Sequence, residues 1–244
     1  MGYHRGMPDG AHPLDNVVWH ALNGPLSRFR AADSTPDFVR FDPEVNVFGA
    51  VDRMDASSWP MIADAVGREG FCALFRDVVE PSPPGWECHF RARVLQMVAE
   101  ELAEPRGAPV QTLGDADAPE MLALAQQTEP GPFFARTHEL GGFIGVRRDD
   151  RLVAMAGERM RVPGWVEVSA VCTHPDTRGQ GLAGELTLQV AQAIRRDGDE
   201  AFLHVLVDNE NAIRLYQKLG FVTRREVEVV FVQWHGAGWK PSPV

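Results

Sequence analysis

Cysteine is scarce in this sequence, and long apolar runs are missing. Only three cysteines occur, at positions 72, 88 and 172, and no two of them form a C-x-x-C pair. An odd number of cysteines without metal-like spacing predicts free thiols in a reducing compartment. No stretch approaches the roughly 18 apolar residues of a membrane span, and the N-terminus lacks the apolar core of a signal peptide. We therefore expect a cytoplasmic protein that does not act in a membrane.

Basic patches and familiar catalytic motifs are also missing. Asp and Glu number 34 against 24 Lys and Arg, so the net charge is -10, and the acidic excess is present in both halves of the chain. This balance disfavours nucleic acid as a partner. No H-E-x-x-H motif, carboxylate cluster or Ser/His/Asp order appears, so we expect no metal. The chain has 244 residues, 44% of them hydrophobic, which is enough for one large or two small domains.

Periodicity and turn residues predict alternating helices and strands in two regions. Residues 1–108 form a predicted N-terminal α/β region, residues 109–238 a second domain and residues 239–244 a tail. The elements expected in the first region are a helix at 17–22 capped at Asp15 or Asn16, strands at 38–41, 45–48 and 71–75, a helix at 61–66, and a strand followed by a short helix within 86–101. Those expected in the second are strands at 110–113, 142–148, 152–157, 165–171 and 202–207, helices at 121–125, within 134–140, at 182–196 and from about 212 to 219, and a β pair of 221–222 with 227–234.

The most informative stretch is a glycine-rich loop at residues 179–184. Before it, residues 165–171 are rich in β-branched side chains, as a strand requires. After it, Leu186, Val190 and Ile194 recur at helical spacing. A strand that leads through glycines into a helix N-terminus creates an anion site, because unpaired N–H groups and the positive end of the helix dipole converge there. The loop is therefore predicted to bind phosphate.

Two glycine patterns overlap in this loop. Gly179-x-Gly181-x-x-Gly184 has the spacing of a dinucleotide-binding turn, which would indicate a nicotinamide-dependent oxidoreductase. However, residues 172–178 separate the strand from the first glycine, and only about sixty residues follow the loop, too few for the βαβ repeats of that fold. No Gly-Lys-Ser/Thr follows, so the Walker pattern is absent as well.

The second pattern is Arg178-x-x-Gly181-x-Ala183, which is followed by Asn209-x-x-Ala212-Ile213-x-Leu215-Tyr216-x-x-x-Gly220-Phe221. This ordered pair resembles the pyrophosphate loop and the following motif of the GNAT acyltransferase superfamily. The resemblance covers residues 109–234 and implies an α/β (α+β) fold, with a mixed, mostly antiparallel sheet flanked by helices. A second, smaller α/β domain would precede it, and we interpret residues 1–108 as a degenerate GNAT-like copy.

The resemblance implies acetyl-CoA, or another acyl-CoA, as donor. Its pyrophosphate would lie on the backbone of the loop, with Arg178 either adding charge or facing solvent. Two strands of the family splay apart, and the pantetheine arm lies between them, bound through the backbone of Val171 and Thr173; an N–H near Val171 or Cys172 would polarise the thioester carbonyl. Asn209 would lie beside the donor, cap a helix, or both. The loop residues so assigned are Gly179, Gln180, Gly181, Leu182, Ala183 and Gly184.

Proton transfer is assigned to two residues on the same grounds. Tyr216 matches the family's general acid, which protonates the departing thiolate, although an aromatic packed on the sheet is the alternative. Glu167 lies where one branch of the superfamily carries its general base, and partial burial would raise its pKa; a structural role in the sheet is the alternative. His174 is interpreted as a turn residue and His204 as a sheet residue. Cys172 is a packed strand residue rather than a nucleophile.

These observations predict an acetyl-CoA-dependent N-acetyltransferase. It would transfer the acetyl group to a primary amine of a small molecule or peptide, by direct attack in a ternary complex. The alternative from another class is a non-catalytic acyl-CoA-binding or protein-interaction module. The sequence does not identify the acceptor, and it leaves open whether the chain forms a homodimer.

Overall fold

The computed structural model describes residues 12–238 and divides into two compact units. Within the described residues, unit 1 comprises residues 12–43, Val47–Val94 and residues 226–238; unit 2 comprises Glu44–Asn46 and Leu95–Arg225. These units do not coincide with a linear division after residue 108, because the last strand of the chain returns to unit 1. The tail expected at residues 239–244 lies outside the described residues.

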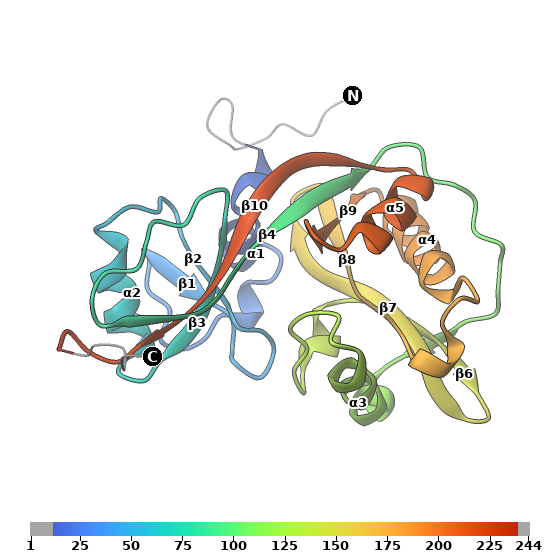
Figure 1. Cartoon of the computed structure of the whole chain (residues 1–244), viewed down its shortest axis with the longest axis horizontal. Coiled ribbons are helices and arrows are strands. Elements are labelled where there is room, and N and C mark those ends of the chain that lie inside the picture. The colour runs from blue at the N-terminus through green and yellow to red at the C-terminus, as the bar shows by residue number, and fades with distance from the viewer. Residues whose placement is uncertain (1–11, 239–244) are drawn as a thin grey trace. The chain divides into compact units, whose positions relative to one another are not determined.

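Unit 1 is a short sheet with helices. Its strands are β1 (Phe38–Arg40), β2 (Phe48–Val51) and β3 (Phe71–Arg76), together with the first part of β4 (Trp86–Ala99) and the last part of β10 (Phe221–Trp234), and its helices are η1 (Pro13–Asn16), α1 (Val17–Leu22), η2 (Ser27–Phe29) and α2 (Ser58–Val66) (Figure 1). Strand β2 is antiparallel to β1 and parallel to β3, and α2 connects β2 to β3. Trp59 and Ile62 of α2 pack against Leu74 of β3 and Val230 of β10 in the core of this unit.

Unit 2 is a larger sheet with helices on both faces. Its remaining strands are β5 (Gln111–Leu113), β6 (Phe143–Arg148), β7 (Arg151–Val162), β8 (Trp165–Thr173) and β9 (Glu200–Leu206), and its helices are η3 (Asp115–Asp117), α3 (Ala118–Thr128), η4 (Thr137–Leu140), η5 (Pro175–Thr177), α4 (Leu182–Arg196) and α5 (Glu210–Lys218). Strands β5 to β8 are successively antiparallel, whereas β8 and β9 are parallel. The predicted α/β fold with a mixed, mostly antiparallel sheet is confirmed.

The two faces of this sheet are covered by different helices. The predicted stripe of α4, which includes Leu186 and Ile194, packs against Val166 and Leu203. On the opposite face, side chains of α3 such as Met121 pack against residues of β7 and β8 in a separate cluster. Successive strand residues point to opposite faces, so one strand supplies both cores. None of the helices in residues 12–238 has the length and hydropathy to cross a lipid bilayer.

The hairpin and the principal helix occur where the sequence places them. Asp149 and Asp150 connect β6 to β7, and both have left-handed backbone conformations, with φ of 48° and 62°. Asp tolerates this region better than most residues, and a turn of this kind fits the twist of a hairpin. Helix α4 spans Leu182–Arg196 as predicted.

Three expected elements are wrong. Residues 45–47 are not in a strand, because the Val45 carbonyl accepts a hydrogen bond from the Thr137 hydroxyl at 2.7 Å, and β2 begins only at Phe48. The strand and helix expected within 86–101 are one strand, β4, and the β pair expected after residue 220 is also one strand, β10. Charged residues of β4 and β10 pair with each other, as Arg93 does with Glu226 at 2.6 Å.

The expected cap of the first helix is also wrong. Neither Asp15 nor Asn16 caps α1 with its side chain. Asp15 lies in the preceding turn, where its carboxylate accepts from the His12 N–H at 3.2 Å. Asn16 is buried, and its Nδ2 donates to the carbonyls of Val51 at 2.9 Å and Asp52 at 3.2 Å. The strand carbonyls fix the orientation of this amide, and its Oδ1 has no hydrogen-bond partner among residues 12–238. Tertiary contacts thus override the local capping preference.

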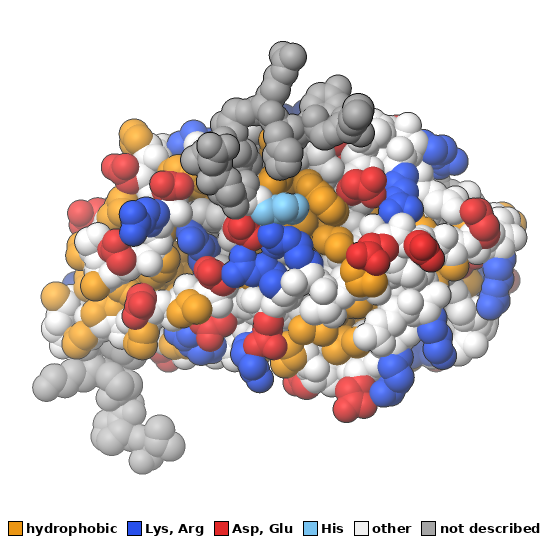
Figure 2. All heavy atoms as spheres, turned by 90° about the horizontal axis from the view of Figure 1, so that it is seen from above, with side chains coloured by type: hydrophobic (Ala, Val, Ile, Leu, Met, Phe, Trp, Pro, Cys, Tyr) orange, Lys and Arg blue, Asp and Glu red, His pale blue; other side chains and the backbone are white. Residues whose placement is uncertain are grey.

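Charges of both signs are mixed on the surface. On the face in Figure 2, basic and acidic side chains are interspersed, with apolar side chains between them. This distribution agrees with the modest acidic excess of the composition.

Gly220 is a steric constraint at the end of α5. It has φ of 96°, and a Cβ placed on it would lie 1.9 Å from the Glu101 carbonyl oxygen. We expect Gly220→Ala to lower the free energy of unfolding by about 3 kcal/mol, from the positive φ and the clash together. Gly198→Ala is the matched control, since Gly198 has φ of 90° and an added Cβ there meets nothing within 4 Å.

Urea unfolding of both variants measures the difference. The control should lose about 1 kcal/mol, the cost of the left-handed backbone alone. Equal losses for the two variants would contradict the close approach between α5 and residue 101.

Candidate active site

Strands β8 and β9 pair only where they begin. Their parallel register starts with Trp165 opposite Glu200 and ends with Glu167 opposite Phe202. Strand β8 nevertheless continues to Thr173, and none of residues 12–238 pairs with it on its β9 side beyond Glu167. The carboxyl ends of these central strands are therefore open between their backbones, as the resemblance implies. An extended molecule with amide groups has the chemistry to hydrogen-bond to such an edge.

A β-bulge in β8 accompanies this separation. The register with β7 shifts so that Ala170 and Val171 together oppose the single residue Ala156. Ala170 has φ of 52°, which is unfavourable for a residue with a Cβ. A bulge leaves one residue unpaired and bends the strand. The backbone near Val171 is therefore irregular at the position where the sequence predicts polarisation of a thioester.

The turn after β8 is fixed by hydrogen bonds. His174 is buried, its Nδ1 accepts from the Asp176 N–H at 3.3 Å, and its Nε2 lies 3.0 Å from the Gln127 amide. The Thr177 hydroxyl donates to the His174 carbonyl at 3.1 Å. Both ring nitrogens are engaged, so the interpretation of His174 as a turn residue agrees with its contacts. This turn sets the position of the glycine loop that follows.

The glycine loop exposes backbone donors at the start of α4. Gly179 and Gly181 have φ of 79° and 78°, and Gly181 is the N-cap residue, with no side chain to cap the helix. Among residues 12–238, none accepts a hydrogen bond from the N–H groups of residues 179–184. Glycines make this conformation accessible, and the helix dipole favours an anion there. These donors can bind phosphate.

The glycine at position 184 has a different function from the other two. It is buried in α4, and a Cβ on it would lie 3.2 Å from Leu215 of α5. Gly184 therefore permits the close approach of α5 to α4, which brings the motif containing Tyr216 next to the loop. The glycines at 179, 181 and 184 have the spacing of a dinucleotide-binding turn, but only the first two lie in the loop. Gly184 instead allows two helices to pack closely.

Tyr216 packs beside the start of β10 with its hydroxyl unpaired. Its ring lies 6.1 Å from that of Phe221, between ring centroids, and it borders the α4 core. The hydroxyl forms no hydrogen bond within the described part of the chain. Burial raises the pKa of Tyr216 to about 12, so the phenol is protonated at neutral pH. The sequence supports two interpretations of Tyr216, as an aromatic residue packed on the sheet or as a general acid. Its ring packs as the first interpretation predicts, and its phenol has the protonation state that the second requires.

Asn209 and Arg178 already have intramolecular partners. The Asn209 side-chain oxygen accepts from the Ala212 N–H at 3.1 Å, so this residue caps α5. The Arg178 side chain is exposed, and its Nε donates to the Thr173 carbonyl at 3.4 Å. Neither contact excludes a second contact with a ligand, because both side chains keep further N–H donors. Their binding to the donor stays a prediction.

Thr173 and Cys172 lie at the end of β8. The Thr173 hydroxyl oxygen is buried and has no hydrogen-bond partner among the described residues. Burial raises the pKa of the Cys172 thiol to about 11, which keeps it protonated at neutral pH. A protonated, buried thiol is a poor nucleophile, and its contacts agree with a packing role.

Glu167 lies in a buried polar row that crosses five strands. Arg159 of β7 donates to both carboxylate oxygens of Glu167, at 2.8 and 2.7 Å. On the other side, Nδ1 of His204 in β9 lies 2.7 Å from Glu167 Oε1. The row continues through Gln96 of β4, whose Nε2 lies 3.1 Å from His204 Nε2, to Arg224 of β10, which donates to the Gln96 oxygen at 2.7 Å.

The charges in this row differ from the sequence-based expectation. Burial alone would raise the pKa of Glu167, but the Arg159 guanidinium and the His204 ring outweigh it and lower the pKa to about 2. Burial also lowers the pKa of His204, so its ring is neutral and donates from Nδ1 to Glu167. The expected rise in the pKa of Glu167 is therefore wrong. A carboxylate with this pKa accepts a proton poorly. Its general-base role stays a prediction.

Four residues of this region carry no recognisable signal in the sequence: Arg159, Gln96, Arg224 and Arg106. Gln96 falls in a segment expected to contain a helix, so its place in a row across the sheet had no signal. Arg106 lies in the expected junction between domains, yet its Nη1 is 3.5 Å from the Cβ position of Gly181. Arg106 lies beside Gly181 because the segment between β4 and β5 runs along α4.

Comparison with known proteins identifies the family. A family model described as FR47-like protein matches residues 143–230. A crystal structure from Novosphingobium aromaticivorans that is assigned to the GNAT family is 38% identical, with a TM-score of 0.84, and the match covers 92% of this chain and 99% of that one. The chain belongs to the GNAT family of acetyltransferases. The resemblance inferred from the two motifs is thus confirmed.

Other relatives are less similar in sequence or match a smaller part of the chain. The GNAT structure of a GCN5-related N-acetyltransferase from Kribbella flavida has a TM-score of 0.64 and 19% identity, covers 93% of this chain and 97% of its own, and supports the fold alone. Mycothiol acetyltransferase from Brachybacterium faecium is 32% identical over 124 residues, which are 47% of this chain and 36% of that protein. The same enzyme from Saccharopolyspora erythraea is 34% identical over 37% of this chain and 30% of its own. The chain thus spans about a third of these curated relatives.

The ion pair of Glu167 predicts a stability effect. Glu167→Gln leaves the Arg159 guanidinium buried without its charge partner, so we expect a loss of about 3 kcal/mol in the free energy of unfolding. Because the folded pKa lies below the ordinary value of 4.5, the stabilisation is complete above about pH 4.5 and is lost as the pH falls toward 2. Urea unfolding at pH 7 and at pH 3 should therefore show a smaller loss at pH 3.

Glu200→Gln is the control, because its pair with Arg195, at 3.1 Å, is exposed and should contribute less than about 1 kcal/mol. A Glu167→Gln variant with unchanged stability and turnover reduced by about 10²-fold or more would instead support the general-base role.

Proposed function

We propose that this protein is an acetyl-CoA-dependent N-acetyltransferase that acetylates a primary amine. The observation that carries the proposal is the opening between β8 and β9, together with the unpaired N–H groups of residues 179–184 that follow β8 in the chain. Family membership supports the same conclusion independently. The loop donors would bind the pyrophosphate of the donor, while the free edge of β8 from Val171 to Thr173 would bind the pantetheine amides.

The acyl transfer is proposed to be direct. The amine nitrogen attacks the thioester carbonyl, a C–N bond forms and the C–S bond breaks. Tyr216 gives its phenolic proton to the departing thiolate, and the proton lost by the amine returns to the phenolate through solvent. No acyl-enzyme is needed, in keeping with the protonated thiol of Cys172. The carbonyl oxygen would be stabilised by a backbone N–H at the bulge near Val171.

The acceptor is proposed to be an amine of a small molecule or peptide. Two of the curated relatives are mycothiol acetyltransferases, and this chain matches only about a third of each. Mycothiol-related amines are therefore one class to screen, together with polyamines, aminoglycosides and peptide N-termini.

The proposal predicts release of free CoA when acetyl-CoA and a suitable amine are both present. A thiol-reactive dye measures this release, and mass spectrometry of the acceptor should show one added acetyl group. Binding of acetyl-CoA without transfer to any amine class would favour the alternative of a non-catalytic module. Binding of NADH in place of acetyl-CoA would overturn the proposal.

Tyr216→Phe tests the proposed acid in the same assay. The substitution keeps the ring that packs near Phe221 and removes only the hydroxyl, so turnover should fall about 10²-fold to 10⁴-fold. The dissociation constant for acetyl-CoA, measured by calorimetry, should stay unchanged. Gln217→Ala, at an exposed neighbouring position of α5, is the control. Turnover of Tyr216→Phe within about twofold of the wild type would remove the acid role.

A further inference from the structure

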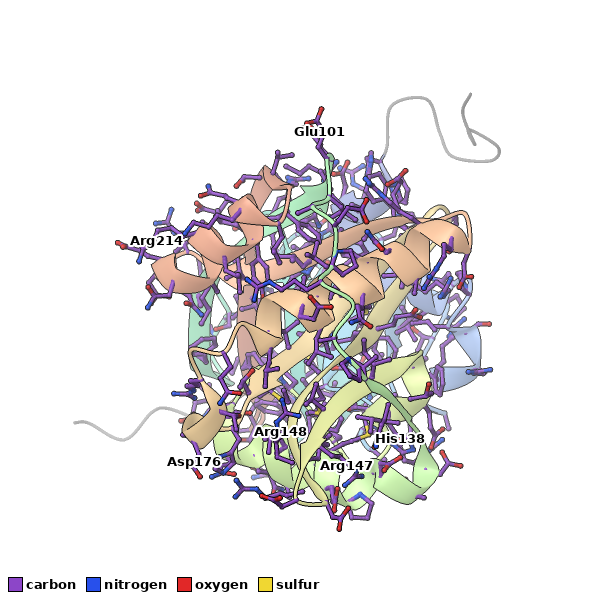
Figure 3. The ribbon with its side chains drawn as sticks, turned by 90° about the vertical axis from the view of Figure 1, so that its right-hand side faces the viewer. Glu101, His138, Arg147, Arg148, Asp176 and Arg214 are labelled. Carbon is purple, nitrogen blue, oxygen red and sulfur yellow. The ribbon has the colours of Figure 1, made fainter. Side chains whose placement is uncertain are left out.

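Residues 100–110 connect β4 to β5, and this connector lies along α4. Figure 3 shows the chain passing from Glu101 across α4 toward β5. Side chains at successive turns of the helix hold it in place. Arg195 donates to the carbonyls of Ala99 and Glu100 at 3.0 and 2.9 Å, Gln192 to the Glu104 carboxylate at 3.2 Å, and Gln189 to the Ala108 carbonyl at 2.9 Å.

Glu185, in the first turn of α4, is the principal anchor of this connector. One carboxylate oxygen accepts from the Arg106 N–H at 2.8 Å, and the other accepts from the Ala108 N–H at 3.0 Å and from Gln189 at 2.7 Å. The residue is buried, with 7% of its surface exposed. Charge-assisted hydrogen bonds of this kind are stronger than neutral ones, so residues 106–108 are held against the start of α4.

Arg106 is brought beside the glycine loop in this way. Its Nη1 lies 3.5 Å from the position that a Cβ on Gly181 would occupy. The side chain is exposed and forms no hydrogen bond or ion pair with any of residues 12–238. An unpaired guanidinium therefore lies next to the unpaired N–H groups of the loop. The two kinds of donor are complementary to one phosphate group, since guanidinium binds phosphate through paired N–H groups.

We propose that Arg106 binds the pyrophosphate of the acyl-CoA donor together with the glycine loop, and that Glu185 is the positioning residue for Arg106. This inference rests on the proposed function, because it names a further ligand of the same site. The connector is then part of the donor site, although it precedes the first strand of the family's motif-bearing region in the sequence.

Arg178, the cation that the family motif supplies, directly precedes the loop in the sequence. Its Nε is directed to the Thr173 carbonyl, toward the end of β8. Arg106 approaches from α4 and Gly181. Two cations from different segments then flank the loop, and each neutralises part of a ligand that carries several negative charges.

Arg106→Gln tests the assignment. We expect the dissociation constant for acetyl-CoA, measured by calorimetry, to rise about tenfold, in line with loss of one charge-assisted hydrogen bond. The same factor should appear with 3′-dephospho-CoA, which keeps the pyrophosphate, and the preference for CoA over pantetheine should fall by about tenfold. Arg196→Gln, which removes an exposed arginine at the opposite end of α4, should leave donor affinity unchanged.

Glu185→Gln tests positioning. Alone it should weaken binding of acetyl-CoA, and in the Arg106→Gln background it should cause no further loss. A merely structural role would give the same additional loss in both backgrounds, which would overturn the positioning role.

The failures of the two proposals are distinguishable. Wild-type protein that binds no acyl-CoA overturns the proposed function and this inference with it. Wild-type protein that binds acetyl-CoA, with Arg106→Gln binding it equally well, overturns the inference alone. Loss of the Arg106→Gln effect when 3′-dephospho-CoA replaces CoA would contradict the assignment to the pyrophosphate.

Discussion

The separation of β8 from β9 is the constraint on which the candidate site depends. Two parallel strands with apolar side chains would ordinarily pair along their length, because unpaired backbone groups are costly. Here pairing stops at Glu167 and Phe202, and the bulge at Ala170 and Val171 follows within a few residues. At the last paired position, Glu167 of β8 lies 2.7 Å from Nδ1 of His204 in β9. This buried contact links the two strands at the point beyond which their pairing ends.

The remaining parts of the site take their positions from this opening. The turn at His174 to Thr177 carries the chain from the open end of β8 to the glycine loop, and Gly184 lets α5 approach α4 closely enough to place Tyr216 nearby. The connector adds Arg106 from a distant part of the sequence. A loop with unpaired N–H donors, an unpaired strand edge and a protonated phenol are thereby assembled from local and tertiary contacts.

Local signals made part of this predictable. Helix α4, the β6–β7 hairpin and the loop followed from short-range patterns, since glycines, Asp residues in the turn and an apolar stripe act within a few residues. The charge state of Glu167 did not follow, because Arg159 and His204 reach it from other strands. The long strands β4 and β10 were interrupted in the prediction, because pairs such as Arg91 with Glu228 and Arg93 with Glu226 join residues far apart in the sequence. The position of Arg106 beside the loop could not be predicted, because it depends on the path of the connector along α4.

Amide hydrogen exchange with and without acetyl-CoA tests the central claim most directly, namely that the donor occupies the opening between β8 and β9 and the loop at the start of α4. The account predicts slower exchange at Val171 to Thr173 and at residues 179–184 when acetyl-CoA is added, and little change in β5 and β6. Protection by acetyl-CoA confined to other segments, or no protection at saturating acetyl-CoA, would contradict it.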